Sequence, residues 1–294
     1  MEIKAKKDGL IFDLLLEEFG SASKTRIRKM LKYEMVKVGG KTISRADFAI
    51  KAGQHLEYVK KTLRDKIVQS PVPIIFEDDY LLVVEKPPGL LTYGQKGTGG
   101  TSLYRILKDF IKQRSSGRQR VYVVHRLDRE VSGLVLFAKD EKIQQQIKAN
   151  WKGTKKLYYG LVEGRPENEG GTLRSWLKEG PGRKMTEVNK PDGAKLAVTH
   201  YRILKKLPGY TLLEIEPETG RKNQVRVHLA GLGYPLVGDR RYGAADEVLR
   251  RIRLHAFYLS FIHPVSGRFL EFRNPMPRAF LVPGNKDEVY KYLS

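Results

Sequence analysis

Runs of apolar residues alternate with short polar segments along the chain, and two of these runs frame a loop rich in charged side chains. Residues 121–124 and 134–137 are apolar and of strand length, so they predict two β-strands. Between them lie His-Arg-Leu-Asp at 125–128 and a turn closed by Gly133. Functional side chains concentrate on polar loops held by a rigid scaffold. We therefore take Asp128 as a candidate functional carboxylate.

Two arginines, Arg126 and Arg129, flank Asp128 in this loop. Their charges favour the ionised carboxylate, which acts only as a hydrogen-bond acceptor. An isolated pair of Asp and Arg can equally serve only to stabilise a turn, so this pattern alone leaves both roles open.

The remaining apolar runs predict a sheet rather than a regular βαβ array. Further strands are expected to begin near Ile74, Leu81, Lys156, Ala197, Tyr210 and Leu254. Hairpin-like spacing near Asp78 and Asp128 favours antiparallel pairing. We predict an α+β fold with a mixed, mostly antiparallel sheet flanked by helices and loops.

The first residues have the pattern of a small separate module. Residues 10–19 predict a helix ended by Gly20, and a serine at 21 or 23 can cap a second helix that runs to about Met35. A hairpin with a Gly-Gly turn is expected over 36–43, followed by a strand within 53–59.

These patterns divide the chain into three parts. We expect residues 1–60 to form the small module, the basic and polar residues 61–73 a linker, and residues 74–294 the large domain that carries Asp128.

A row of basic residues lies on the second predicted helix. Lys24, Arg28 and Lys32 stand at positions i, i+4 and i+8, so they share one helix face. Such a row is either an ordinary solvated face or a contact for phosphate groups.

Charge indicates the kind of partner. The chain has 294 residues with a formal net charge of +22 and a pI near 9.9. This charge suits a polyanion, and because it is spread along the chain it favours nucleic acid over a membrane surface. No apolar stretch reaches the length of a membrane-spanning helix, and the first residues have no apolar targeting core. We therefore expect a cytoplasmic protein.

The absence of cysteine restricts the chemistry. It excludes disulfides, cysteine-based zinc sites, zinc nucleobase deaminases and the thiolate nucleophile of pyrimidine C5 methyltransferases. The six histidines show no metal-ligand spacing, so we predict no metal. A protein-kinase reading fails because Leu127 separates His-Arg from Asp and no Asp-Phe-Gly follows. Acid–base and carboxylate chemistry remains.

Several segments in order resemble the pseudouridine synthases that modify large-subunit ribosomal RNA and some tRNAs. The matching segments are His-Arg-Leu-Asp-x-x-x-Ser-Gly-Leu-x-Leu-Phe-Ala-Lys at 125–139, Lys-Pro-Pro-Gly at 86–89, Lys-x-Tyr at 156–158, and Gly-Arg-x-x-Gln-Val-Arg at 220–226. Two departures are visible: Val131 replaces a common Thr, and Lys222-Asn223 replaces a common Thr-His. The resemblance covers residues 76–277, and residues 1–60 resemble an S4-like RNA-binding domain.

The resemblance implies roles for particular residues. Asp128 is the expected catalytic residue, acting by nucleophilic attack or by assisting an eliminated base. Arg226 is expected to pair with Asp128, and Tyr158 to stack on the uracil and transfer a proton. The expected RNA contacts are Arg126, which enters the RNA where the base has left, together with His125, Arg129, Arg221, Lys24, Arg28 and Lys32.

No cofactor is expected, because the isomerisation neither transfers electrons nor imports a group. The resemblance favours large-subunit ribosomal RNA as the partner, with tRNA as the alternative and a monomer as the default. One rival is a non-catalytic RNA-binding factor of ribosome assembly that has kept the fold. A nuclease would need paired metal-binding carboxylates or two histidines, which we do not find near the motifs.

Overall fold

The computed structural model describes residues 2–20, 23–32, 35–58, 70–94, 101–189, 193–245 and 251–280. The chain divides into two compact units, Met1–Val68 and Gln69–Ser294. We call them unit 1 and unit 2 and describe each by itself. Most of the predicted linker, residues 61–69, lies outside the described residues.

Unit 1 combines two helices with short strands. Its helices are α1 (Ile11–Glu18) and α2 (Lys24–Lys32). One sheet has the order β1 (Glu2–Lys4), β6 (His55–Tyr58), β3 (Val36–Val38) and β4 (Lys41–Thr42), and β2 (Gly9–Leu10) pairs with β5 (Ala49–Ile50). These elements include both predicted helices, the hairpin and the closing strand.

The turn between β3 and β4 shows why the sequence has two glycines there. Gly39 and Gly40 have φ values of +55° and +78°. A two-residue hairpin turn with positive φ at both positions matches the right-handed twist of the strands, and glycine adopts it without steric cost. A core that includes Ile11, Leu15 and Ile27 packs the helices against this sheet.

Unit 2 is built on an eleven-stranded sheet. Its main path has the order β13, β12, β14, β15, β11, β16, β10, β8 and β7, while β17 pairs with β16 and β9 with β10. The strands are β7 (Ile74–Glu77), β8 (Leu81–Lys86), β9 (Tyr122–Val123), β10 (Ser132–Ala138), β11 (Lys155–Glu163), β12 (Gly170–Glu179), β13 (Met185–Val188), β14 (Lys195–Leu207), β15 (Tyr210–Pro217), β16 (Leu254–Ile262) and β17 (Phe269–Arg273).

The predicted mixed, mostly antiparallel sheet is confirmed. Every strand pair recorded in unit 2 is antiparallel except β10 with β16. The parallel pair has Ser132 opposite His255 and Gly133 opposite Ala256. Gly133 has φ +119°, and an added Cβ would lie 2.2 Å from the Ala256 carbonyl oxygen. Only glycine allows this close approach of the two strands beside the candidate loop.

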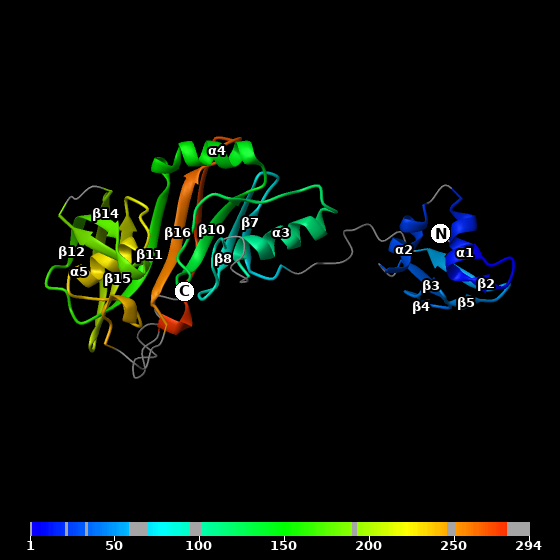
Figure 1. The fold of residues 1–294 in the computed structure, drawn as a ribbon, viewed down its shortest axis with the longest axis horizontal. Helices are drawn as coiled ribbons and strands as arrows, with labels where there is room; N and C mark the ends of the chain where they lie inside the picture. The colour runs from blue at the N-terminus through cyan, green and yellow to red at the C-terminus, as the bar shows by residue number, and fades with distance from the viewer. Residues whose placement is uncertain are drawn as a thin grey trace. The chain divides into compact units, whose positions relative to one another are not determined.

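Three helices flank this sheet: α3 (Leu103–Arg114), α4 (Glu141–Ala149) and α5 (Gln224–Gly231). In Figure 1, α3 lies beside β7 and β8, whereas α5 lies beside β12, β14 and β15. Side-chain caps begin the first two: Ser102 Oγ accepts the Arg105 N–H, and Asp140 accepts the Lys142 N–H. Short 3₁₀ segments occur at Trp151–Gly153, Pro181–Arg183, Arg240–Tyr242 and Arg278–Phe280.

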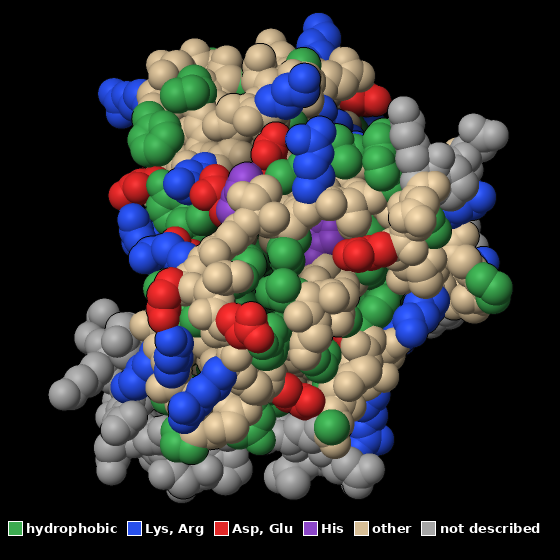
Figure 2. All heavy atoms as spheres, turned by 90° about the vertical axis from the view of Figure 1, so that its left-hand side faces the viewer, with side chains coloured by type: hydrophobic (Ala, Val, Ile, Leu, Met, Phe, Trp, Pro, Cys, Tyr) green, Lys and Arg blue, Asp and Glu red, His purple; other side chains and the backbone are tan. Residues whose placement is uncertain are grey.

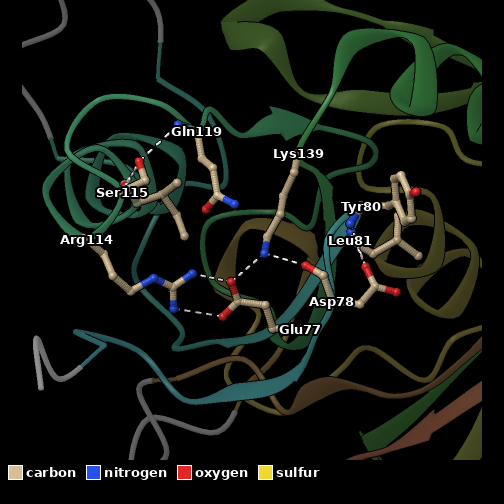
Figure 3. A network of polar contacts seen from close by, with 9 residues as sticks. Glu77, Asp78, Tyr80, Leu81, Arg114, Ser115, Gln119 and Lys139 are labelled. Carbon is tan, nitrogen blue, oxygen red and sulfur yellow. Dashed lines mark hydrogen bonds and ion pairs between the residues drawn. The ribbon is translucent and has the colours of Figure 1, made fainter. Parts of the chain in front are cut away.

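A charged network joins α3 to the β7–β8 turn (Figure 3). Glu77 accepts hydrogen bonds from both Arg114 and Lys139. The neighbouring Asp78 accepts the N–H groups of Tyr80 and Leu81 at 2.8 and 2.7 Å, which forms the turn between the two strands. This network is structural and lines neither of the cavities described below.

Charges of both signs are mixed on the face that Figure 2 shows. Figure 2, which views unit 2 from its β12–α5 end, shows Lys and Arg side chains interspersed with Asp and Glu rather than gathered in one patch. Among the described residues, no helix is long and apolar enough to cross a membrane. The cytoplasmic location therefore stays a prediction from the sequence.

Candidate active site

The loop between β9 and β10 is held by hydrogen bonds on both sides of Asp128. Thr92 Oγ1 donates to the Leu127 carbonyl at 2.8 Å and accepts the Leu127 N–H at 3.0 Å. Ser132 Oγ lies 2.9 Å from His255 Nδ1. Leu127 and Val131 are buried, so the loop is anchored by packing as well. These contacts restrict the position of the carboxylate between them.

The side chain of Lys86 also holds this loop in place. Its fully buried ammonium donates to the carbonyls of Pro87, Leu90 and Arg129 at 2.9, 2.7 and 3.0 Å. Burial lowers the pKa of Lys86 to about 8, although the charges of Glu130 and Asp128 oppose this effect. The lysine therefore connects the Lys-Pro-Pro-Gly turn to the loop that carries Asp128.

Asp128 lies where two cavities meet. Cavity A, of about 410 Å³, is lined by Asp128, Tyr158, Val225 and Leu254 among others. Cavity B, of about 500 Å³, also reaches Asp128 and is lined on its other side by Tyr93 and Arg240. No side chain among the described residues forms a hydrogen bond or ion pair with the Asp128 carboxylate, which leaves it available to a ligand.

Of the two arginines that flank Asp128 in the sequence, Arg126 lowers the pKa of its carboxyl group as expected. Burial raises the pKa of Asp128, and the charges of Arg226 and Arg126 only partly offset it. Arg129 takes no part in this balance: its Nε donates to the Gly89 carbonyl at 3.0 Å. The carboxylate is therefore more basic than an ordinary aspartate.

Tyr158 lies on β11 and lines cavity A with Asp128. A register shift between Leu157 and Tyr158 interrupts the pairing of β11 with β16 at this point. Burial and the charge of Asp128 both raise the pKa of the Tyr158 hydroxyl. The hydroxyl therefore keeps its proton and acts as a hydrogen-bond donor at neutral pH.

The predicted pairing of Arg226 with Asp128 is not formed as an ion pair among the described residues. Arg226 forms a bidentate ion pair with the buried Asp239, with Nε–Oδ2 and Nη2–Oδ1 distances of 2.7 and 2.8 Å. Its guanidinium carbon lies 4.9 Å from the centre of the Tyr242 ring. Arg226 acts on Asp128 through its charge, and among the described residues its side chain forms its ion pair with Asp239 and no hydrogen bond with Asp128.

Asn223, one of the departures from the common motif, takes a defined place in this cluster. Its φ and ψ are +53° and 18°, a left-handed conformation that asparagine tolerates better than most residues. Its Oδ1 accepts from Arg226 Nη1 at 3.3 Å, and its Nδ2 donates to the Tyr242 hydroxyl at 3.1 Å. Asn223 thus joins Arg226 to Tyr242 at the start of α5.

The residues predicted to contact RNA differ in their surroundings. Arg126 is exposed and lines both cavities. Arg221 borders cavity A and donates to the Leu196 carbonyl at 3.0 Å. His125 Nε2 accepts the Leu136 N–H at 3.0 Å, and burial lowers the pKa of His125 to about 3, so it is neutral. Arg129 borders only cavity B.

The remaining predicted contacts lie in unit 1. Lys24 and Arg28 are exposed on α2, and the guanidinium carbon of Arg28 lies 5.6 Å from the centre of the Phe12 ring. Lys32 ends the helix, and its side chain lies outside what the structure describes. Unit 1 therefore presents at least part of the predicted basic face.

Sequence reasoning missed the supporting roles of Thr92, Asp239 and Tyr242. Asp239 follows Gly238, but nothing in the sequence around it indicated that its partner lies thirteen positions earlier. For the supporting role of Lys86, the sequence did carry a signal. A lysine at the end of an apolar strand, at the start of the Lys-Pro-Pro-Gly turn, needs buried acceptors for its ammonium. Within the described residues, no group of three or more acidic, His or Cys side chains is arranged to hold a metal.

Comparison with known proteins gives consistent matches. A family model described as RNA pseudouridylate synthase matches residues 80–231. The chain is 34% identical over 280 residues to an uncharacterised RNA pseudouridine synthase of Synechocystis, covering 90% of this chain and 85% of the relative. It is 30% identical over 313 residues to ribosomal large subunit pseudouridine synthase D of Haemophilus ducreyi, covering 99% and 95%.

A solved structure shares the fold. Human RNA pseudouridylate synthase domain containing 4 superposes with a TM-score of 0.59 at 26% sequence identity. The match covers 71% of this chain and 90% of the human chain.

Proposed function

Because the chain belongs to the RNA pseudouridylate synthase family and is an RNA pseudouridine synthase, we propose that Asp128 is its catalytic carboxylate. The observation that carries this proposal is a partly buried carboxylate without a side-chain partner among the described residues, on a fixed loop where two cavities meet. A free carboxylate in such a place can touch a substrate, whereas the paired Asp239 cannot.

The reaction breaks the bond between uracil and ribose, turns the base and rejoins it through C5. An ionised carboxylate assists either by attacking the substrate or by supporting the eliminated base, and both routes place it against the same bond. The raised pKa makes Asp128 a stronger base and nucleophile than an ordinary aspartate. A base stacked within RNA is out of reach, so the target uridine turns out of the RNA to meet it.

Cavity A receives this uridine. Tyr158 presents an aromatic ring and a protonated hydroxyl there, and Val225 and Leu254 add apolar surface. An aromatic ring suits stacking on a base, and a hydroxyl donor suits the uracil carbonyl groups. Arg126, at the junction of both cavities, is placed to occupy the gap that the base leaves.

Arg226 is a positioning residue whose charge also acts on Asp128. The pair with Asp239 fixes the guanidinium, and this charge lowers the pKa of Asp128 against the effect of burial. Without it the carboxylate would hold its proton to a higher pH, and less of the enzyme would be active at neutral pH.

Unit 1 is proposed to be an S4-like RNA-binding domain that contacts phosphates through Lys24, Arg28 and Lys32. Large-subunit ribosomal RNA is the favoured substrate, since relatives carry that substrate in their names. A tRNA substrate is the alternative, and a monomer remains the expected state. The rival assembly factor without catalysis is disfavoured, because the family is one of synthases.

The test measures tritium release from RNA labelled at uridine C5, because rejoining through C5 expels that hydrogen. Unmodified large-subunit ribosomal RNA and tRNA are offered separately to the wild type. Release from ribosomal RNA alone is the expected result, and release from tRNA alone would overturn the substrate proposal. Tight binding of both RNAs without release would overturn the activity itself.

A further inference from the structure

Cavity B shares Asp128 with cavity A, but part of its wall, which includes Tyr93 and Arg240, has no role in the placement of the target uridine proposed above. With about 500 Å³ it is large enough for a small organic ligand. Six of its lining residues are Arg or Lys, and three are Asp or Glu. Since Asp239 is neutralised by Arg226, the chamber favours an anion.

Arg240 is the strongest candidate for contact with that anion. It follows Asp239, begins a 3₁₀ turn and is exposed at the cavity wall. Two other cations of this wall are engaged: Arg241 donates to the Gly182 carbonyl at 2.6 Å, and Lys222 lies 2.8 Å from Glu179. No hydrogen bond or ion pair is recorded between the Arg240 side chain and any described residue. Among the described residues, none occupies its five donors, and a ligand anion can bind them.

An exposed aromatic ring stands on the same cavity. Tyr93 is 58% exposed, and its ring centre lies 5.2 Å from that of Tyr104. Leu91, Leu127 and Ile252 add apolar wall, so the chamber is not merely a cluster of charges. A ring fixed on one side and open on the other is a surface on which a nucleic-acid base stacks.

The geometry points to cavity B as the site of a second nucleotide, the immediate neighbour of the target uridine in the RNA. Its phosphate binds Arg240, and its base stacks on Tyr93. Both cavities open at Asp128, so one RNA strand passes Arg126 with its target uridine in cavity A and its neighbour in cavity B. This inference rests on the proposed function, and it makes Tyr93 partly responsible for the preference of the enzyme for the RNA sequence around the target uridine.

The first test is the salt dependence of RNA binding. The probe is the shortest fragment of large-subunit ribosomal RNA that the wild type still modifies, and affinities are measured from low to moderate salt. Arg240→Ala should lower the slope of log affinity against log salt by about 0.7, the value for one phosphate contact of a single strand. Arg240→Lys should restore most of the slope.

Arg268→Ala is the matched control. Arg268 is an exposed arginine in the hairpin between β16 and β17. The strand β16 has nine residues, so its far end lies roughly 25 Å from Leu254 in cavity A. This variant removes the same charge and should leave the slope unchanged.

The second test separates the base from the phosphate. Tyr93→Ala should weaken binding about tenfold without changing the salt slope, and Tyr93→Phe should bind like the wild type. Two further RNAs each carry an abasic residue beside the target uridine, one on its 5′ side and one on its 3′ side. In one of these two RNAs, Tyr93→Ala should bind with the same affinity as the wild type. If Tyr93→Ala weakens binding of both abasic RNAs as much as it weakens binding of the intact RNA, the inference is overturned. It is also overturned if Arg240→Ala and Arg268→Ala have the same salt slope.

Failure of the inference is distinguishable from failure of the proposed function. Tritium release by the wild type on the same RNA tests the function alone. If the wild type releases tritium while Arg240→Ala and Tyr93→Ala bind like Arg268→Ala, only the second nucleotide site is wrong. If no RNA fragment is modified by the wild type, the proposed function is wrong, and the inference is wrong with it.

Discussion

The surroundings of Asp128 disfavour the ionised form of its carboxyl group. Burial raises its pKa, and the charges of Arg226 and Arg126 only partly offset this. A carboxyl group with a raised pKa in the folded chain binds its proton more tightly there than in the unfolded chain. Folding stability therefore falls as pH rises from the ordinary aspartate pKa through the raised one. At neutral pH, ionised Asp128 costs the fold some stability.

Asp128→Asn should accordingly unfold at a higher temperature than the wild type at pH 7. The amide has nearly the same shape and carries no charge that burial would penalise. The difference should shrink as pH falls below the ordinary aspartate value, where the wild-type residue is also neutral. Thermal unfolding followed at several pH values measures this, and a destabilised Asp128→Asn at pH 7 would contradict it.

The same balance predicts the pH dependence of turnover. If Asp128 must be ionised, kcat rises with pH through its raised pKa. Arg126→Gln removes a charge that lowers this pKa, so the acid limb of the kcat profile should move to higher pH. Arg268→Gln provides the control and should leave the limb in place. An unshifted profile for Arg126→Gln would argue that another group controls the limb.

Asn223 combines two roles that substitutions can separate. Asn223→Ala loses the bridge from Arg226 to Tyr242 and places a residue that tolerates the left-handed backbone less well than asparagine, at a cost of about 1 kcal/mol in unfolding free energy. Asn223→Gly has no backbone strain, but it also lacks the bridge. We expect Gly to recover much of the stability, while kcat stays low in both variants. Full kcat in Asn223→Gly would show that the bridge does not matter.

At the scale of elements, the strand–loop–strand segment around Asp128 could be predicted from its sequence. The apolar runs and Gly133 fix where the strands and the turn lie, because these are local preferences. The parallel pairing of β10 with β16 could not be predicted this way, since it joins residues more than 120 positions apart. The ion pair of Arg226 and Asp239 was missed for a related reason: the turn after α5 decides which carboxylate reaches the arginine.

Lys86 shows how an element supports the loop. Lys86→Met should lower the free energy of unfolding by about 3 kcal/mol or more, because the carbonyls of Pro87, Leu90 and Arg129 lose their shared donor. Denaturant unfolding measures this, with the exposed Lys142→Met on α4 as the control. A loss equal to that of the control would show that the three bonds contribute little.

At the scale of the whole molecule, net charge and the order of motifs were enough to indicate an RNA enzyme of this family. The charge of +22 indicated a polyanion, and the motifs narrowed the chemistry. The composition could not indicate that the target carboxylate stands between two cavities, because that depends on segments brought together by the eleven-stranded sheet.

We expect unit 1 to contribute to RNA affinity and unit 2 to carry the catalytic chemistry. A double variant, Lys24→Ala with Arg28→Ala, should weaken RNA binding and lower its salt slope by about 1.4, the value for two phosphate contacts of a single strand. At saturating RNA its kcat should match the wild type, because cavity A is unchanged. Lys51→Ala in unit 1 serves as the single-charge control. Reduced kcat with unchanged affinity would contradict this division.

The most direct measurement is single-turnover tritium release from RNA labelled at uridine C5, with wild type and Asp128→Asn each saturating the RNA. RNA affinity is measured on the same preparations. We expect rapid release by the wild type and none above background by Asp128→Asn, with equal affinities. Release by Asp128→Asn at a rate near that of the wild type would contradict the assignment of Asp128 as the catalytic carboxylate.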